Sequence, residues 1–360
     1  MKLLNLLLVC LIVSTQVQAA GVAVVTPKDG DEMRFGHQLQ EGVKIAVDEI
    51  NDAGGLLGEK LELVVIDDVC SESFFHGNTQ KLYTGEGSNV NLVIGPYCDG
   101  KSLPAKTRQA LQILPQPLDE QNYTDKTSGV LRIGGMIKQQ ADIVAQVYKE
   151  QWVDKNIAVI YDSRNQATYE TAAYLQEIFI ADNLQNRLNL YDFAAYKKLK
   201  PMAKEIVKNN KIAYILGDKT QIAKLAQKLQ EKNENIILLL NEYQAGLHFF
   251  KEMGNFAEGT YWLRLDDQKA NSEFTDKLVD MRIRGREPHG LGIMGYSAVM
   301  LWFDMVKAAK SFNVNDLDKI STQKEWNMPW GKVKFKKGQI SEVSGWNMYR
   351  FNDGEYTQIN

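Results

Sequence analysis

Polar side chains follow several of the predicted β-strands in this chain, and they are the residues best suited to bind a ligand. Ligands of open α/β sheets bind just beyond the carboxyl ends of the strands, where carboxylates can meet an amine or hydroxyl group. A carboxylate there can instead cap the following helix, whose first N–H groups favour an anion. Both interpretations stay open for Asp162 and Asp218, whereas glutamate is a poor cap, which favours a ligand role for Glu242. The candidates are Asp67, Asp68, Asp99, Gln116, Asp162, Asp218 and Glu242.

Two cysteines, Cys70 and Cys98, also end strand-like runs, in the segments IDDVC and LVIGPYC. Removal of the N-terminal segment would leave them as the only cysteines of the chain. Because an exported protein meets an oxidising compartment, we expect a single disulfide between them. This bridge would join the ends of two strands, and neither thiol would then act as a nucleophile.

Motifs of the common enzyme classes are absent from the sequence. It holds no GxSxG, HExxH or GxxxxGK[ST] segment, and no GxGxxG follows the first predicted strand. The four histidines are far apart and lack metal-ligand spacing. We therefore expect no enzyme activity, no cofactor and no metal site.

The N-terminus is typical of a secretion signal. Lys2 supplies the positive charge, the run from Leu3 to Val13 is largely apolar, and Val17-Gln18-Ala19 is an acceptable cleavage site. The run is well short of the ~20 residues that span a bilayer, so we expect cleavage and export rather than an anchor. A lipid anchor at Cys10 is the alternative, but Val9 stands where lipoprotein signals carry a small residue.

Composition and charge are those of an ordinary globular protein of 360 residues, which is ample for two domains. The formal net charge is −3, so nucleic-acid binding, which requires a basic face, is not expected. Lysines at 332, 334, 336 and 337 form a local cluster on a predicted strand, which indicates a solvated face. No segment after the N-terminus is long and apolar enough to span a membrane.

The first third of the chain alternates strand and helix signals. Val22–Thr26, Leu61–Ile66 and Asn91–Ile94 are short strand-like runs. Between the first two, apolar residues recur at helical spacing until Asn51-Asp52-Ala53-Gly54-Gly55 stops the helix. A strand–helix–strand order implies a parallel sheet that is covered on both faces.

The alternation of strand and helix signals begins again near residue 137 and indicates a second, similar α/β lobe. Strands are predicted at Ile157–Tyr161, Ile212–Leu216 and Ile236–Leu240, and a helix from about Thr168 to Ala181. The last third differs in character. It contains a long apolar segment, Gly290–Lys310, that we interpret as a buried core helix, followed by short β-like pieces.

On these features the sequence resembles the type I periplasmic solute-binding proteins, and it is close in layout to the leucine/isoleucine/valine-binding family of ABC importers. The resemblance covers essentially the whole mature chain. It is strongest in the segments AVVTPKDGDEMRFG, EGVKIAVDEINDAGGLLGEKLELVVIDDVC and VIGPYC. The segment GYSAVMLWFDMVKAA resembles the family's long helix before the final strands, and Cys70 and Cys98 match its disulfide pair in position.

The resemblance implies an α/β fold of two Rossmann-like lobes with mostly parallel sheets. A three-segment hinge would join the lobes and let them close around a ligand. Residues 1–19 would form the signal peptide. Lobe 1 would comprise residues 20–136 plus 264–342, and lobe 2 residues 137–263 plus 343–360.

In this family an amino-acid ligand has its carboxylate held by the first lobe and its ammonium group held by an acidic residue of the second. Glu242 falls at the position of that acidic residue, Phe35 at the family's pocket aromatic, and Tyr169 near an aromatic that covers the ligand. The strand ends and the resemblance together predict the ligand-binding residues Phe35, Asp99, Gly100, Gln116, Tyr169, Asp218 and Glu242.

The sequence departs from the family where the ligand carboxylate would bind. Asp99-Gly100-Lys101 stands where serine or threonine is usual, and Leu114-Pro115-Gln116-Pro117-Leu118 replaces a hydroxyl-bearing segment. At ~4 Å and an effective dielectric constant of about 20, Asp99 would repel a carboxylate by about 4 kcal/mol. Unless Lys101 offsets it or Asp99 points elsewhere, that repulsion abolishes micromolar binding. We therefore expect a polar ligand with amine, amide or hydroxyl groups rather than a branched-chain amino acid.

The predicted function is the periplasmic substrate-binding component of an ABC-type importer. It would be a monomer that captures a small polar solute (amino-acid-like, amine or amide) in the cleft between the lobes by hinge closure. It would deliver this solute to a permease in the inner membrane. The alternative is a ligand-sensing or accessory periplasmic protein of the same fold that feeds no transporter. An exported hydrolase is a third class, and the missing nucleophile motif argues against it.

Overall fold

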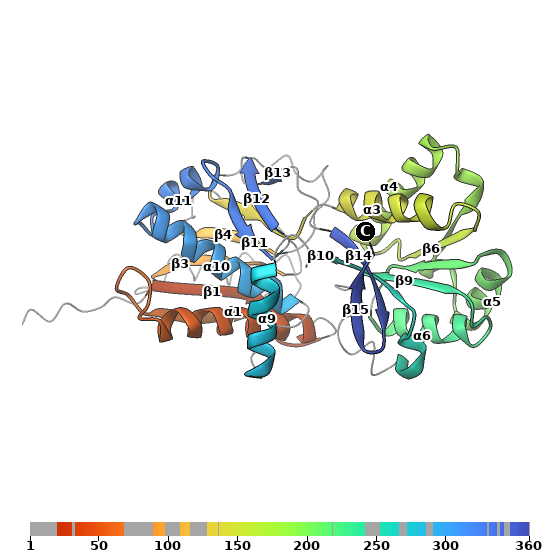
Figure 1. Ribbon diagram of the computed structural model, residues 1–360, viewed down its shortest axis with the longest axis horizontal. Coiled ribbons are helices and arrows are strands. Elements are labelled where there is room, and N and C mark those ends of the chain that lie inside the picture. The colour runs from red at the N-terminus through yellow and green to blue at the C-terminus, as the bar shows by residue number, and fades with distance from the viewer. Residues whose placement is uncertain are drawn as a thin grey trace, which may run out of the picture.

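A computed structural model of the chain arranges its secondary structure in two halves (Figure 1). Each half is built around one large β-sheet, and helices pack against both sheets. The structure describes residues 20–30, 33–67, 89–97, 109–115, 128–135, 137–217, 219–241, 253–265, 272–285, 291–329, 331–336, 339–341 and 346–359.

The first sheet has five parallel strands in the order β2-β1-β3-β4-β5. All seven residues of β1 are buried, because the strand lies inside the sheet and is covered by helices. The strands are β1 (Ala20–Thr26), β2 (Leu61–Asp67), β3 (Val90–Ile94), β4 (Leu111–Leu114) and β5 (Val130–Arg132). The three strands predicted in this region are confirmed, and β4 and β5 were not predicted.

Helix α1 (Met33–Asp52) connects β1 to β2 and packs along α10 (Leu291–Ala309). The apolar residues that recur at helical spacing in α1 are all buried, and Gly54 and Gly55 follow the helix with positive φ angles, as predicted. A Cβ atom on Gly42 would collide with the carbonyl oxygen of Gly292, so the two helix backbones touch.

Helix α10 is the apolar helix that the sequence predicts, and it lies in the core. It contributes two of the largest buried side chains of this half, Trp302 and Tyr296. Neither α10 nor any other helix within the described ranges combines the length and hydropathy needed to cross a membrane.

The second sheet has seven strands in the order β15-β14-β10-β9-β8-β6-β7. The run from β7 through β10 is parallel, whereas β14 pairs antiparallel with β10 and β15 with β14. The strands are β6 (Ile157–Tyr161), β7 (Leu188–Asp192), β8 (Ile212–Ile215), β9 (Ile237–Asn241), β10 (Tyr261–Leu265), β14 (Trp346–Asn352) and β15 (Glu355–Gln358).

Helices and short 3-10 turns accompany the second sheet. They pack β6, β8 and β9 into a continuous apolar interior, so these strands read as uninterrupted apolar runs in the sequence. The helices are α3 (Ile137–Gln151), α4 (Gln166–Ala181), α5 (Leu199–Asn209) and α6 (Lys219–Gln230), and the turns are η3 (Gln185–Arg187), η4 (Phe193–Ala195) and η5 (Gly254–Ala257).

A small three-stranded antiparallel sheet completes the half that contains β1. In its central strand, buried and exposed residues alternate, and the lysines at 332, 334 and 336 are on the exposed face. The solvated-face interpretation of these three lysines is therefore confirmed. The strands of this sheet are β11 (Trp326–Met328), β12 (Gly331–Lys336) and β13 (Gln339–Ser341). The remaining helices of the last third of the chain are α9 (Ser272–Ile283) and α11 (Val314–Ser321).

The chain passes between the two large sheets three times: after β5, after β10 and before β14. This arrangement confirms the predicted α/β class with mostly parallel sheets and three connecting segments. The predicted domain boundary at 263/264 falls inside β10, and the domain limits stay predictions. The signal segment 1–19 lies outside the described residues.

Candidate ligand-binding site

Each large sheet contains one point at which the direction of strand order reverses. From β1 the chain moves to β2 on one side and then to β3 on the other, and from β6 it moves to β7 and then to β8. In open α/β sheets the crevice outside the carboxyl ends at such a switch point is the usual ligand site. In Figure 1, β1 runs from the outer end of its half toward the middle of the molecule. We therefore build the candidate site from the β1/β3 ends and the β6/β8 ends.

The first switch point is shaped by close approach of the backbone. A Cβ atom on Gly36, in the first turn of α1, would collide with the carbonyl oxygen of Pro27. A Cβ atom on Gly95 would collide with the carbonyl oxygen of Val25. Only glycine fits at these two positions, so α1 and the end of β3 come closer to the end of β1 than any side chain would allow.

Two aromatic rings pack beside these glycines. The ring centroids of Phe35 and Tyr97 lie 6.0 Å apart, and both residues belong to the hydrophobic core. Phe35, predicted to line the pocket, is only 5% exposed, and its ligand role stays a prediction. Tyr97 was not predicted, although it stands directly before Cys98 in the segment VIGPYC. At the same strand ends, a carboxylate oxygen of Asp67 accepts a hydrogen bond from the backbone N–H of Lys28 at 3.2 Å.

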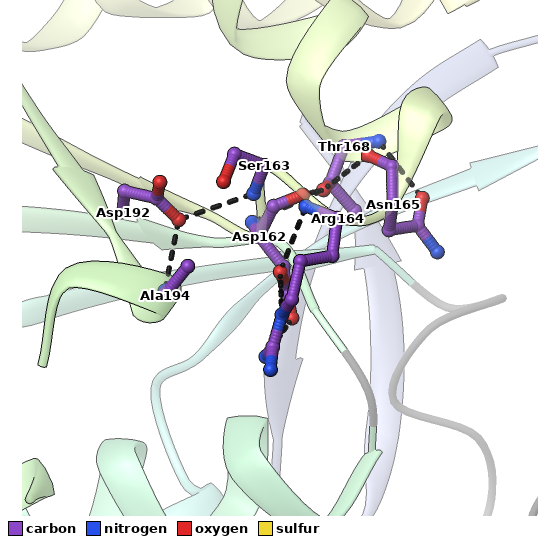
Figure 2. A network of polar contacts seen from close by, with 7 residues as sticks. All are labelled: Asp162, Ser163, Arg164, Asn165, Thr168, Asp192 and Ala194. Atoms are coloured by element: carbon purple, nitrogen blue, oxygen red, sulfur yellow. Dashed lines mark hydrogen bonds and ion pairs between the residues drawn. The ribbon is translucent and has the colours of Figure 1, made fainter. Parts of the chain in front are cut away.

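The second switch point carries a polar network instead, which Figure 2 shows. Asp162 directly follows β6, and one of its carboxylate oxygens accepts hydrogen bonds from the backbone N–H (3.0 Å) and Nε (2.8 Å) of Arg164. The other oxygen accepts a hydrogen bond from the same guanidinium at 2.6 Å. The guanidinium of Arg164 therefore binds the Asp162 carboxylate in a bidentate way, which is the stronger geometry for an arginine–carboxylate pair.

Helix α4 is capped by another residue of this loop. The side chain of Asn165 accepts a hydrogen bond from the backbone N–H of Thr168 at 3.2 Å, so Asn165 is the N-cap and Asp162 is not. The Thr168 hydroxyl donates to the Asp162 carbonyl oxygen at 2.8 Å and accepts from the Asp162 N–H at 3.1 Å. The helix-capping interpretation of Asp162 is thus wrong, because asparagine three residues later occupies the cap and frees Asp162 to hold Arg164.

Hydrogen bonds lower the pKa values of two carboxyl groups at these strand ends, those of Asp162 and Asp192. The hydrogen bonds from the Arg164 side chain lower the pKa of Asp162 against the effect of burial. For Asp192, at the end of β7, burial acts to raise the pKa, but hydrogen bonds from the side chain and backbone N–H of Ser163 and from the backbone N–H of Ala194 bring it below its usual value. The Asp162 side chain is 12% exposed and that of Arg164 65%, so the pair presents its guanidinium toward solvent.

Two tyrosines flank the polar loop. The ring centroids of Tyr161, at the end of β6, and Tyr169, in the first turn of α4, lie 6.2 Å apart. Burial raises the pKa of the Tyr161 hydroxyl, and the negative charge of Asp192 adds to the effect. Tyr169 is 48% exposed, which leaves its ring accessible beside the loop. Its predicted role as an aromatic cover for the ligand stays a prediction.

The end of β9 is held by a buried amide pair that sequence reasoning missed. The side-chain Nδ2 of Asn241 donates to Oε1 of Gln140 at 2.7 Å, and both residues are buried. Gln140 belongs to the first turn of α3, 101 positions away, so no local pattern could have joined the two. Asn241 is followed in the sequence by Glu242, the predicted ammonium-binding residue.

Several predicted residues lie outside the part of the chain that the structure describes. Their ligand roles and the disulfide therefore stay predictions. They are Asp68, Asp99, Gly100, Gln116, Asp218 and Glu242, together with Cys70 and Cys98. Over the described ranges, no three His, Cys, Asp or Glu side chains gather in a way that could hold a metal ion.

The sequence of this chain is similar to those of known periplasmic binding proteins. The periplasmic binding protein family matches residues 20–355. The Leu/Ile/Val-binding protein homolog 1 of Brucella suis is 24% identical over 355 residues, which covers 94% of this chain and 92% of the relative.

Two solved structures share the fold at low identity. One is a branched-chain amino acid transporter substrate-binding protein from Streptococcus pneumoniae in complex with isoleucine (TM-score 0.77, 17% identity, 94% of this chain and 97% of that one). The other is an ABC-transporter solute-binding protein from Rhodopseudomonas palustris in complex with 3,4-dihydroxybenzoic acid (TM-score 0.77, 16% identity, 95% and 96%).

Proposed function

The chain belongs to the periplasmic binding protein family, and on that premise we propose that it is the substrate-binding component of an ABC-type importer. Members of this family bind small molecules and do not transform them. The match over residues 20–355, which spans both large sheets and both switch points, is the observation that carries the proposal. Closure of the two halves around a solute would then present the loaded protein to a permease in the inner membrane.

We propose that the ligand is a small polar solute with amine, amide or hydroxyl groups. Two features support this class. Asp99 is acidic and stands in the segment that the family resemblance implies for the ligand carboxylate, and the loop at the β6/β8 ends is charged. The fold likeness does not select a class by itself, since one similar structure holds isoleucine and another a dihydroxybenzoic acid.

A thermal-shift screen of the mature protein tests this proposal. It would include amino acids, amines, polyols, small amides and organic acids. A compound at about 100 times its dissociation constant adds about 2.7 kcal/mol to the free energy of unfolding, which is a clear rise in melting temperature. We expect the largest rise from an amine, amide or polyol. The largest rise from leucine, isoleucine or valine would overturn the ligand class.

Two variants separate the predicted ligand residue from its neighbours. Glu242→Ala should abolish the shift caused by the best compound, because it removes the acidic residue predicted to bind the ligand amine. Asp68→Ala, at another strand end, should leave the shift intact. Equal losses in both variants would contradict the site assignment.

The family match and the N-terminal signal pattern also support export. We propose that residues 1–19 are cleaved and that the mature protein is a periplasmic monomer. Intact mass of the protein recovered from the periplasmic fraction should match a chain that begins at Ala20. Recovery of the uncleaved chain with the membranes would contradict it.

A further inference from the structure

The three connections between the sheets have their described ends close to one buried side chain. In the first connection, β5 ends at Arg132, α3 begins at Ile137, and Gly135 lies between them with a φ of +74°. Such a backbone angle is strained for any residue with a side chain, so glycine is the residue suited to this position.

The other two connections meet in one antiparallel pair. Leu265 is the last residue of β10, before the second connection, and Trp346 is the first residue of β14, after the third. The two residues are partners in the β10–β14 ladder. The indole of Trp346 is fully buried, so it is a fixed part of the core at this place.

Gly135 and Trp346 bring all three connections together. A Cβ atom on Gly135 would lie 2.7 Å from Nε1 and 3.4 Å from Cδ1 of the Trp346 indole. Gly135, in the first connection, therefore packs against the Trp346 indole. Trp346 follows the third connection, and it pairs in the sheet with Leu265, which precedes the second. Close packing of this kind leaves few alternative arrangements, because interiors resist even one added methyl group.

The same connection leads directly to the candidate site. Helix α3 starts two residues after Gly135, and Oε1 of Gln139 lies 3.4 Å from the point that a Cβ atom on Gly135 would occupy. In the next position, Gln140 holds Asn241 at the carboxyl end of β9. A shift of the first connection against Trp346 thus moves the helix turn that is bonded to a strand end of the site.

We propose that Trp346 is the joint on which the two halves open and close, and that its contact with Gly135 sets the balance between open and closed forms. The proposal rests on the proposed function, because opening and closing matters only for a protein that takes a ligand between its halves. In hinge closures a few connecting residues absorb the change in backbone angles. Here the joint is a glycine that turns against a fixed indole.

Small-angle X-ray scattering of the ligand-free mature protein tests the joint. Gly135→Ala forces a methyl group against the indole, so we expect the radius of gyration and the interatomic distance distribution to differ from those of the wild type. In the double variant Gly135→Ala/Trp346→Leu the side chain ends at Cδ, before the position of the clashing Nε1, so we expect both quantities to return toward the wild-type values. Coupling of this kind between two touching residues is what a double-mutant cycle measures.

A matched control separates the contact from backbone strain. Gly354, in the β14–β15 turn, has a φ of +81°, and no heavy atom lies within 4 Å of a Cβ atom placed there. Gly354→Ala therefore carries similar backbone strain without the clash, and it should leave the scattering curve unchanged. Circular dichroism melting curves confirm that each variant is folded.

The outcomes are distinct. If Gly135→Ala and the wild type scatter identically, or if Gly354→Ala produces the same change, the joint is refuted. If Gly135→Ala does not fold, Trp346→Leu alone decides, since loss of the Nε1 contact should broaden the distance distribution, and an unchanged distribution contradicts the proposal. No ligand enters these measurements, so a ligand screen in which no compound binds would count against the proposed function and not against the joint.

Discussion

The two switch points occupy equivalent places in their sheets but are built from different interactions. Among the described residues at the β1/β3 ends, glycines let backbone approach backbone, and the rings of Phe35 and Tyr97 pack beside them. At the β6/β8 ends, a hydrogen-bonded loop around Asp162 holds a largely exposed arginine. For the described residues, the comparison indicates that packing dominates at the first switch point and polar interactions dominate at the second. Substitutions should therefore affect the first chiefly through packing and the second through hydrogen bonds and charge.

Phe35→Ala should give the largest loss of stability among the changes that test this contrast. The ring is almost fully buried against Tyr97, and truncation of a buried phenylalanine lowers the free energy of unfolding by about 3–5 kcal/mol. Urea denaturation measures this loss directly. Phe35→Leu, which keeps most of the apolar volume, should lose clearly less. A loss below about 1 kcal/mol for Phe35→Ala would mean that packing does not dominate at this switch point.

Thr168→Val should give an intermediate loss at the second switch point. The change keeps the shape of a buried side chain but removes the hydroxyl that bonds both the N–H and the carbonyl of Asp162. We expect the free energy of unfolding to fall by about 1–3 kcal/mol, because buried polar groups of Asp162 lose their partner. Thr171→Val is the matched control, since the Thr171 hydroxyl is also buried but bonds the carbonyl of Ala167 within the same helix. Equal losses in the two variants, measured by urea denaturation, would contradict a special role of the loop network.

Asp162→Asn should have the smallest effect at neutral pH, because the partner guanidinium is mostly exposed and such pairs contribute less than about 1 kcal/mol. The effect of Asp162→Asn on the free energy of unfolding should depend on pH. The pKa of Asp162 is lower in the folded protein than its ordinary value of 3.8, so its stabilising contribution is present above that value and is lost as the pH falls through the folded pKa.

The stability difference between wild type and Asp162→Asn should accordingly be constant from about pH 5 to pH 8 and shrink below about pH 4. Thermal melts in a pH series measure it. A difference that grows as the pH falls would show that the carboxylate is not stabilised by Arg164.

Sequence patterns predicted the strands that carry long apolar runs and the helices with strict periodicity. β6 has the predicted bounds Ile157–Tyr161, and the apolar face of α1 is buried as its spacing indicates. The strands that were missed, such as β5 with three residues and the half-buried β7, have too short or too mixed a pattern to be distinguished from loops.

The candidate site was less predictable because it depends on pairings between distant residues. The strand order that creates the switch points, the Gln140–Asn241 amide pair and the Gly135–Trp346 contact all join positions far apart in the sequence. The sequence left the capping role of Asp162 open for a local reason: aspartate and asparagine both cap helices well, and only backbone geometry selects Asn165.

We propose that a small polar solute is held between the two switch points by closure of the two halves. Small-angle scattering of the wild-type protein, with and without the compound that gives the largest thermal shift, tests it most directly. We predict that saturation with the compound lowers the radius of gyration and narrows the distance distribution. If a compound binds and stabilises the protein while the scattering curve stays unchanged, the two halves do not close around the ligand.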